Sequence, residues 1–119
     1  QQALVMRGQI DAALASYEAV IAERPDAVDA RLRAAEVYLK ERADHRRAAE
    51  LFRAVQRIAT ITPGQDVYVT NRLVDLLTGP LDDPGRALVE LRRLIERYPD
   101  SPAAGHARQA LAALRARRA

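Results

Sequence analysis

The sequence contains no cysteine, no tryptophan and only one lysine, Lys40, among its 119 residues. The absence of cysteine excludes disulfide bonds and thiolate metal sites, and it leaves the redox environment open. Aromatic residues make up only 4% of a chain that is 49% hydrophobic, so we expect a core built mainly from Ala and Leu. Such a composition suits helices that approach one another closely.

Long apolar runs are also missing, because no window approaches the roughly 18 to 20 apolar residues of a membrane span. The net charge of +3 is mild for this length and does not require a polyanionic partner. The chain begins with Gln1 instead of Met, from which we expect a processed protein or part of a longer one. Its length is that of one domain, and we expect a single helical domain over 1–119.

A short pattern occurs three times, over residues 13–20, 48–55 and 87–94. Each copy has an early alanine, a ring or a leucine four residues after it, and a proline beyond. The three alanines lie 35 and 39 residues apart, and the prolines lie 38 and 36 residues apart. A period in the middle thirties predicts a helical solenoid, in which each unit packs on its neighbours. The residues that define the pattern are Ala13, Tyr17, Pro25, Ala48, Phe52, Pro63, Ala87, Leu91 and Pro99.

Proline and glycine separate segments in which apolar residues recur three and four positions apart, which is the helical period. Asp44, Asp83 and Ser101 stand where helix N-caps belong, and we expect Asp66 to cap a further helix. Connectors of two to six residues favour antiparallel neighbours. The predicted helices cover residues 1–7, 9–23, 27–42, 45–61, 66–78, 84–98 and 102–117.

These residues resemble the tetratricopeptide repeat family, and bacterial members of it in particular. The second helix of that repeat has a small residue and a ring at the spacing seen here, and it ends at a proline. The first helix of the repeat is less well matched, since residues 28–42 offer Arg31, the Ala34-Ala35 pair and Tyr38 and so keep part of the pattern, and residues 66–78 keep little of it. The resemblance implies an all-α, right-handed α-solenoid of antiparallel helix pairs. It implies repeat units at about 1–26, 27–64 and 65–100, followed by a capping helix at 101–118.

The register leaves only about seven residues for the opening helix of the first repeat, which is therefore expected to be truncated. The face of residues 10–23 would then be partly uncovered, and upstream sequence, a second copy or another subunit would cover it. A homo-oligomer through this incomplete repeat is one expectation. Residues 96–102 resemble a variant found in many bacterial envelope repeat proteins and also in cytoplasmic ones, so the compartment stays open, with the cell envelope slightly favoured.

Catalytic chemistry finds little support in the sequence. The two histidines, His45 and His106, lie in different helical segments without a second ligand at metal-binding spacing. Ser101 is explained by helix capping, and no Gly-x-Ser-x-Gly surrounds it. The glycines are scattered singles that form no phosphate-binding loop. We expect no enzyme, no metal and no cofactor.

The resemblance implies a non-catalytic scaffold or adaptor for protein–protein interaction, because the first helices of such repeats line a concave surface that holds a protein or peptide. Asn71 and Arg72 are of special interest, since an amide can bond a peptide backbone and a guanidinium can bond a carboxylate. The candidate groove residues are Asp29, Leu32, Arg33, Glu36, Leu39, Thr70, Asn71, Arg72 and Val74.

Nucleic-acid binding is the alternative, and it requires the arginine clusters to share one face. Acidic residues interleave with those clusters, and no exposed aromatic is expected for stacking on bases. Glu90 with Arg93 instead indicates an ordinary charged helix face. The clusters are Arg46 and Arg47, then Arg92, Arg93 and Arg97, then Arg115, Arg117 and Arg118.

Overall fold

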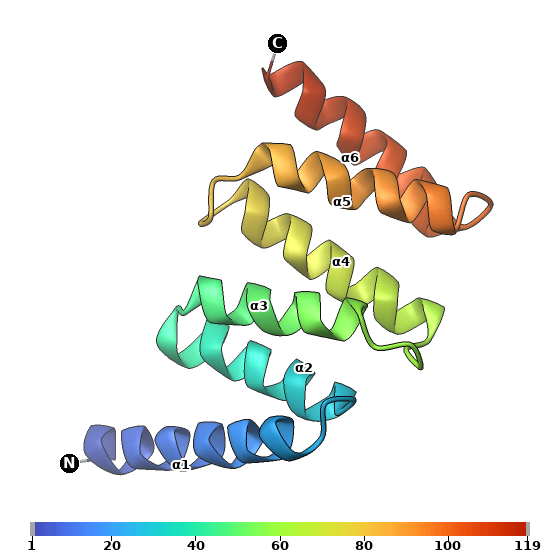
Figure 1. Ribbon diagram of the computed structural model, residues 1–119. Helices are drawn as coiled ribbons and strands as arrows, with labels where there is room; N and C mark the ends of the chain where they lie inside the picture. Colours follow the sequence, from blue (N-terminus) through green and yellow to red (C-terminus); the bar gives the residue numbers. More distant parts are fainter. Residues whose placement is uncertain (1, 119) are drawn as a thin grey trace. The chain divides into compact units, whose positions relative to one another are not determined.

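The computed structural model describes residues 2–118, and within that range its regular elements are helices, with no strand (Figure 1), which confirms the all-α prediction. The handedness of the solenoid, the number of repeats and the repeat boundaries stay predictions. Gln1 and Ala119, both included in the predicted domain, lie outside the described residues, and the description of side chains ends at Arg117. The helices are α1 (Gln2–Glu23), α2 (Val28–Val37), η1 (Tyr38–Arg42, a π-helix), α3 (His45–Gln56), α4 (Pro63–Thr78), α5 (Pro84–Arg97) and α6 (Pro102–Arg118).

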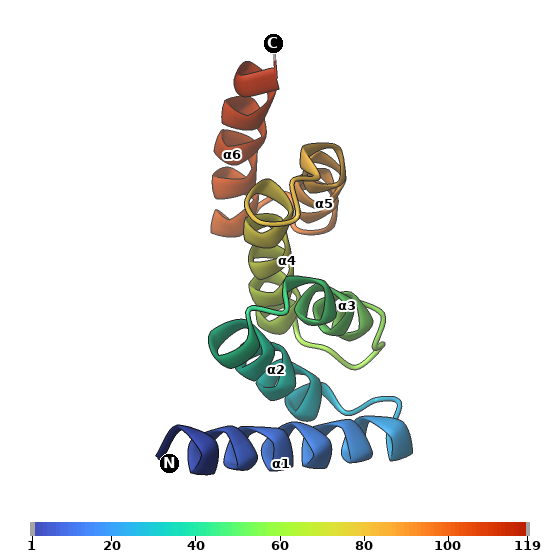
Figure 2. The ribbon, with the colours of Figure 1, turned by 90° about the vertical axis from the view of Figure 1, so that its left-hand side faces the viewer.

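The chain divides into two compact units, unit 1 (Gln1–Ile61) and unit 2 (Thr62–Ala119). In unit 1, α1 packs on α2, and α2 packs on α3. In unit 2, α4 packs on α5, and α5 packs on α6. Figure 1 and Figure 2 show that successive helices within each unit run in opposite directions, as the short connectors predicted. None of the helices within residues 2–118 combines the length and the apolar character that crossing a membrane requires.

The predicted break at Gly8 is wrong, because α1 is one continuous helix of 22 residues. A glycine in a helix interior costs only about 1 kcal/mol relative to alanine, and no proline follows this one. A Cβ atom added at Gly8 would meet no atom within 4 Å, so the residue is not required by close packing either. The separate opening helix expected at 1–7 therefore does not exist.

Most of the predicted helix caps are confirmed. The carboxylate of Asp44 accepts a hydrogen bond from the Arg47 amide at 3.1 Å, and Asp83 does the same for the Arg86 amide at 3.1 Å. The Ser101 hydroxyl accepts from the Ala104 amide at 3.1 Å. Each of these contacts satisfies one amide that a helix N-terminus leaves without an intrahelical partner.

The start of α4 differs from the prediction, because Thr62 is its N-cap and Asp66 is not. The Thr62 hydroxyl accepts from the Gln65 amide, and the Gln65 side chain accepts from the Thr62 amide, which together form a capping box. Pro63 occupies the first turn, where its missing N–H costs nothing. Because a residue before proline is driven to extended backbone, Thr62 cannot continue a helix from α3, which ends at Gln56 and not at residue 61.

The repeated small and large residues form the cores of both units. Ala48 and Phe52 are fully buried in unit 1, and Ala87 is fully buried in unit 2, with Leu91 only 2% exposed. In the first copy of the pattern, Tyr17 is only half-buried. The reason is that α1 packs on α2 along one side, so its motif residues are covered by one helix.

Candidate functional site

The candidate residues of unit 1 lie along one face of α2 and η1. Their spacing of three and four residues places them in register on a helix, and we call them the α2 face. Asp29 and Arg33 are exposed, and Leu32, Glu36 and Leu39 are half-buried. The α2 face therefore combines charged side chains with half-buried leucines.

The opposite side of α2 faces the interior of unit 1. Arg31 is only 9% exposed, and its guanidinium donates to the carbonyl of Ala27 at 3.1 Å and to that of Arg24 at 3.4 Å. It therefore fixes the connection between α1 and α2. Because this inner side is anchored, the α2 face is presented on a firmly held helix.

The candidate residues of unit 2 divide into two groups. Asn71 is exposed and Arg72 is half-buried, whereas Thr70 is fully buried and Val74 is 9% exposed. Thr70 and Val74 therefore do not line an accessible surface, which corrects the predicted groove at these two positions. The physical reason is that α4 buries residues on most of its circumference and leaves only a narrow exposed stripe.

The exposed stripe on α4 includes two residues that the sequence analysis did not select. Tyr68 is 46% exposed and Asp75 is exposed, and with Asn71 and Arg72 they follow the 68, 71, 72, 75 spacing of one helix face. We call these four residues the α4 face. The expectation of no exposed aromatic is thus wrong at Tyr68. The spacing of Tyr68 from Asn71 and Asp75 in the sequence could have indicated that Tyr68 lies on the same helix face as these two residues.

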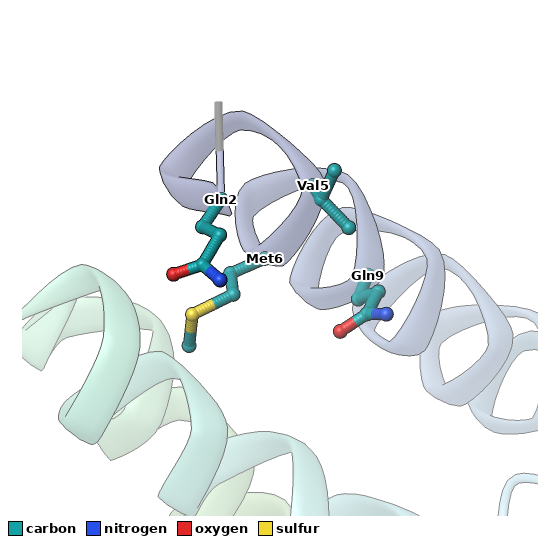
Figure 3. Close-up of a pocket in the computed structure, with 4 residues that line it drawn as sticks. All are labelled: Gln2, Val5, Met6 and Gln9. Atoms are coloured by element: carbon teal, nitrogen blue, oxygen red, sulfur yellow. The ribbon is translucent and has the colours of Figure 1, made fainter.

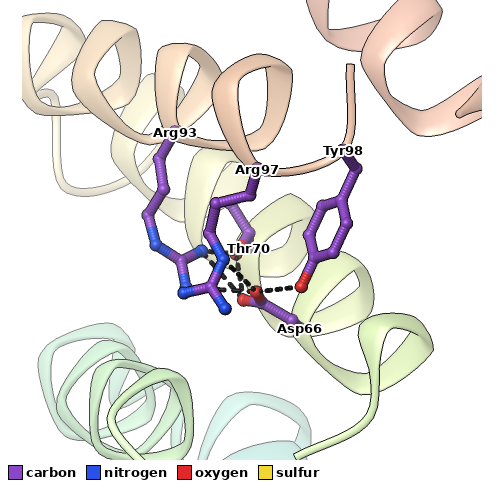
Figure 4. A network of polar contacts seen from close by, with 5 residues as sticks. All are labelled: Asp66, Thr70, Arg93, Arg97 and Tyr98. Carbon is purple, nitrogen blue, oxygen red and sulfur yellow. Dashed lines mark hydrogen bonds and ion pairs between the residues drawn. The ribbon is translucent and has the colours of Figure 1, made fainter. Parts of the chain in front are cut away.

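A buried carboxylate joins α4 to α5 in unit 2 (Figure 4). Asp66 is fully buried and lies between the guanidinium of Arg93, which donates to its two oxygens at 2.8 and 3.1 Å, and the hydroxyl of Tyr98 at 2.6 Å. Arg97 lies at 3.7 Å from the same carboxylate, and the Thr70 hydroxyl accepts from Arg93 at 3.3 Å. Burial raises the pKa of Asp66, but the hydrogen bonds from Arg93 and Tyr98 outweigh it, so the pKa lies below its ordinary value.

A second acidic residue has an equivalent role in unit 1. Glu18 of α1 accepts from Arg47 of α3 at 3.0 and 2.6 Å, and from the hydroxyl of Tyr38 in η1 at 2.7 Å. The Arg47 hydrogen bonds lower the pKa of Glu18. Each unit therefore contains one carboxylate held by an arginine and a tyrosine from neighbouring segments. These groups connect helices within a unit, and their charges compensate one another.

These two networks include arginines from the clusters that the nucleic-acid alternative requires. Arg47 and Arg93, which the sequence assigned to a possible phosphate-binding stripe, are bound to Glu18 and Asp66. Glu90 is only 2% exposed, so the charged helix face predicted for Glu90 and Arg93 is wrong. The three-residue spacing of Glu90 and Arg93 could not show that Arg93 pairs with Asp66, which lies 27 residues earlier in the sequence.

The two histidines, which are the candidates for catalysis or metal binding, lie on different helices in different units. His45 begins α3 in unit 1, whereas His106 lies on the exposed side of α6 in unit 2. Within residues 2–118 no three His, Cys, Asp or Glu side chains are grouped to hold a metal ion. Ser101 is engaged as a helix cap.

One open pocket lies against the first half of α1 in unit 1. It is lined by Gln2, Val5, Met6 and Gln9, all from α1 (Figure 3). Met6 and Gln2 point toward the neighbouring helices, and Val5 points away from them. The pocket offers apolar side chains and two amides, without a charged or nucleophilic group.

Two related protein-family models match different parts of the chain. Residues 1–55 match the model of the tetratricopeptide repeat protein 21 ARM repeat, and residues 73–101 match a tetratricopeptide repeat. No curated protein matches the chain. The first match covers α1, α2 and most of α3, and the second runs from the middle of α4 through α5. The chain is therefore a tetratricopeptide-like helical repeat protein.

Proposed function

We propose that this protein is a non-catalytic adaptor that binds a protein or peptide partner through the α2 face and the α4 face. Tetratricopeptide repeats generally mediate protein–protein interactions, and families of this type are generally non-catalytic scaffolds. The observation that carries the proposal is the exposed stripe of α4, where one aromatic side chain stands beside an amide, a guanidinium and a carboxylate. That combination suits a peptide better than a small apolar ligand.

Each residue of the α4 face has a distinct capacity for recognition. Tyr68, which is 46% exposed, offers a rigid ring with a polar tip, and aromatic residues of this kind are enriched among interface hot spots. The amide of Asn71 can both donate to and accept from a peptide backbone. Arg72 and Asp75 carry opposite charges, so they favour a partner with charges of both signs.

The α4 face is also held in place from behind, which favours selective binding. Thr70 and Asp66 lie on the buried side of the same helix and are tied to Arg93 of α5. A helix that is anchored in this way loses little conformational freedom when a partner binds. In unit 1 the ion pair between Glu18 and Arg47 anchors α1 to α3, and α2 packs on both of these helices.

The test begins with affinity capture from a lysate of the source cells, at low and at moderate salt, with identification by mass spectrometry. A protein partner that survives the salt step is then measured against Tyr68→Ala and against the double variant Glu36→Arg with Asn71→Ala. We expect Tyr68→Ala to weaken binding roughly 30-fold, because a hot-spot residue contributes about 2 kcal/mol. Circular dichroism is expected to show unchanged helix content.

The matched control is Val89→Ala on α5, which removes another exposed side chain, 50% exposed, from outside both faces. Its affinity for the partner is expected to equal that of the wild type. Unchanged affinity in Tyr68→Ala and in the double variant would refute binding through these faces. Recovery of nucleic acid that leaves with salt, with no protein behind it, would favour the alternative of phosphate binding.

A further inference from the structure

The exposed charges are distributed unevenly along the chain. In the described part of unit 1, exposed acidic and basic residues are close to balanced, whereas between residues 84 and 117 six arginines and only two acidic residues are exposed. We call these six residues the α5–α6 arginines, and they are Arg86, Arg92, Arg97, Arg108, Arg115 and Arg117. Such an excess of positive charge attracts negatively charged partners within a Debye length of the surface, roughly 10 Å at 0.1 M salt.

Arg97 is distinguished within this set because it lies beside the buried carboxylate of Asp66 (Figure 4). Asp66 accepts two hydrogen bonds from Arg93, at 2.8 and 3.1 Å. It also accepts from the hydroxyl of Tyr98 at 2.6 Å and from that of Thr70 at 3.4 Å. An ionised carboxylate offers about four acceptor positions. These four contacts fill them, so no acceptor position of Asp66 remains for Arg97.

The contacts of Arg97 itself hold its guanidinium in place without using its donors. Its Nε atom lies 3.7 Å from Oδ2 of Asp66, which is an ion pair but too long for a hydrogen bond. The guanidinium carbon lies over the Tyr98 ring, 5.8 Å from the ring centroid, in a cation–π contact. The side chain is 55% exposed. Among the described residues, Arg97 is therefore positioned by a charge and a ring, and its donors face solvent.

The charges around Asp66 define the ligand that this guanidinium would accept. Arg93 is neutralised by its bidentate pair with Asp66, whereas Arg97, one turn later in α5, is not. Two like charges four residues apart on a helix repel each other, and an additional anion would offset this repulsion. One unused planar guanidinium matches one carboxylate in both charge and bidentate geometry.

We propose that the α5–α6 arginines attract an acidic segment of a protein partner, and that Arg97 anchors it by binding one Asp or Glu carboxylate of that segment. This site goes beyond partner binding through the α2 and α4 faces, because Asp66 lies on the buried side of α4 and the α4 face lies on its exposed side. The other arginines contribute through their long-range field, which accelerates association and favours acidic partners.

An acidic protein segment fits these observations better than nucleic acid does. Bases bind by stacking on exposed aromatic side chains, and between residues 84 and 117 the single aromatic residue, Tyr98, is half-buried with its hydroxyl bound to Asp66. The available group at Arg97 is one guanidinium fork, which is the size of a carboxylate.

The test is a nuclear magnetic resonance titration of the full chain with an oligoglutamate peptide at low salt, in which the arginine Nε–Hε signals are followed. The Arg97 signal is expected to shift and to saturate. Arg97→Ala is expected to bind the peptide about tenfold more weakly, which corresponds to the loss of one charge-assisted pair. The matched control, Arg92→Ala, removes another exposed arginine from α5 and is expected to stay within about twofold of the wild type. Both variants are expected to keep the wild-type circular dichroism spectrum.

Several results would overturn the proposal. One is a wild type that does not bind oligoglutamate at low salt, and another is an equal loss of affinity in Arg97→Ala and Arg92→Ala, since Arg97 would then have no special role. Tighter binding of an oligonucleotide or of a phosphoserine peptide at Arg97 would show that phosphate, and not carboxylate, is the preferred group. Tyr68→Ala is expected to bind oligoglutamate like the wild type, so failure of this site and failure of the α4 face are distinguishable.

Discussion

Arg93 and Asp66 form a bidentate ion pair between α5 and α4, with distances of 2.8 and 3.1 Å and with the carboxylate fully buried. We expect Asp66→Asn to lower the free energy of unfolding by about 3 kcal/mol, because it removes one partner of a buried pair and leaves the guanidinium without its counter-ion. Urea unfolding followed by circular dichroism measures this. Asp75→Asn, an exposed change on the same helix, is expected to stay within about 0.5 kcal/mol of the wild type. Equal effects of the two changes would contradict a stabilising role for the pair.

The buried carboxylate of Asp66 also predicts that the free energy of unfolding falls at acidic pH. The pKa of Asp66 in the folded protein lies below its ordinary value of 3.8, because the hydrogen bonds from Arg93 and Tyr98 outweigh the effect of burial. Its contribution to stability is therefore complete above about pH 4 and is lost as the pH falls through the lowered pKa. The stability difference between wild type and Asp66→Asn is expected to shrink as the pH is lowered below 4. A difference that stays constant down to pH 2 would show that ionisation of Asp66 has no part in it.

The two tyrosines bound to carboxylates predict an effect at alkaline pH. Burial, followed by the hydrogen bonds to Glu18 and Asp66, raises the pKa of Tyr38 and of Tyr98 above 10.0. Their contribution is present below pH 10 and is lost as the pH rises through the raised values. In a titration followed by phenolate absorbance, we expect the double variant Tyr38→Phe with Tyr98→Phe to lose the component that ionises above pH 10. Retention of that component would assign it to the other tyrosines.

The repeated motif allows equivalent positions to be compared within one chain. Phe52 is fully buried, whereas Tyr17, at the same place in the first copy, is only half-buried. Phe52→Ala is expected to cost about 3–5 kcal/mol, because it removes a large buried ring and leaves a cavity. Tyr17→Ala is expected to cost clearly less, since part of its ring already contacts water. Equal losses in urea unfolding would contradict the one-sided packing of α1.

The sequence predicted the helices well where the signals are local. Asp44, Asp83 and Ser101 cap helices as expected, because a cap is decided by residues within one turn. The capping box of Thr62 and Gln65 is equally local, and it starts α4 in place of the expected cap at Asp66. Gly8 suggests a boundary in the sequence, but nothing around it forces the helix to end, and α1 continues through it. A glycine alone is a weak stop signal.

The candidate site was predicted less well, because exposure depends on packing between helices. Periodicity could not show which side of α4 is exposed to solvent, because apolar and polar residues are distributed around most of this helix. Thr70 is therefore buried, and Tyr68 is exposed. Likewise, nothing within a few residues of Arg93 shows that its partner is Asp66, which lies on another helix.

Two glycines of unit 2 are expected to respond to the same substitution with opposite signs. Gly79 ends α4 at φ −107° and ψ −110°, and an added Cβ would lie 3.0 Å from the backbone oxygen of Asp75. That oxygen also accepts the Gly79 amide at 3.1 Å, so it cannot move away without loss of the final turn. Gly79→Ala is expected to destabilise by about 1–2 kcal/mol.

Gly64, near the start of α4, has only the Thr62 hydroxyl near an added Cβ, at 3.8 Å, which is ordinary contact. Alanine there reduces the freedom of the unfolded chain and raises helix propensity, so Gly64→Ala is expected to stabilise by about 0.5–1 kcal/mol. Both variants are measured by urea unfolding at neutral pH. If both lowered stability equally, the close approach of Asp75 to Gly79 could not be the cause, because Gly64 has no such neighbour.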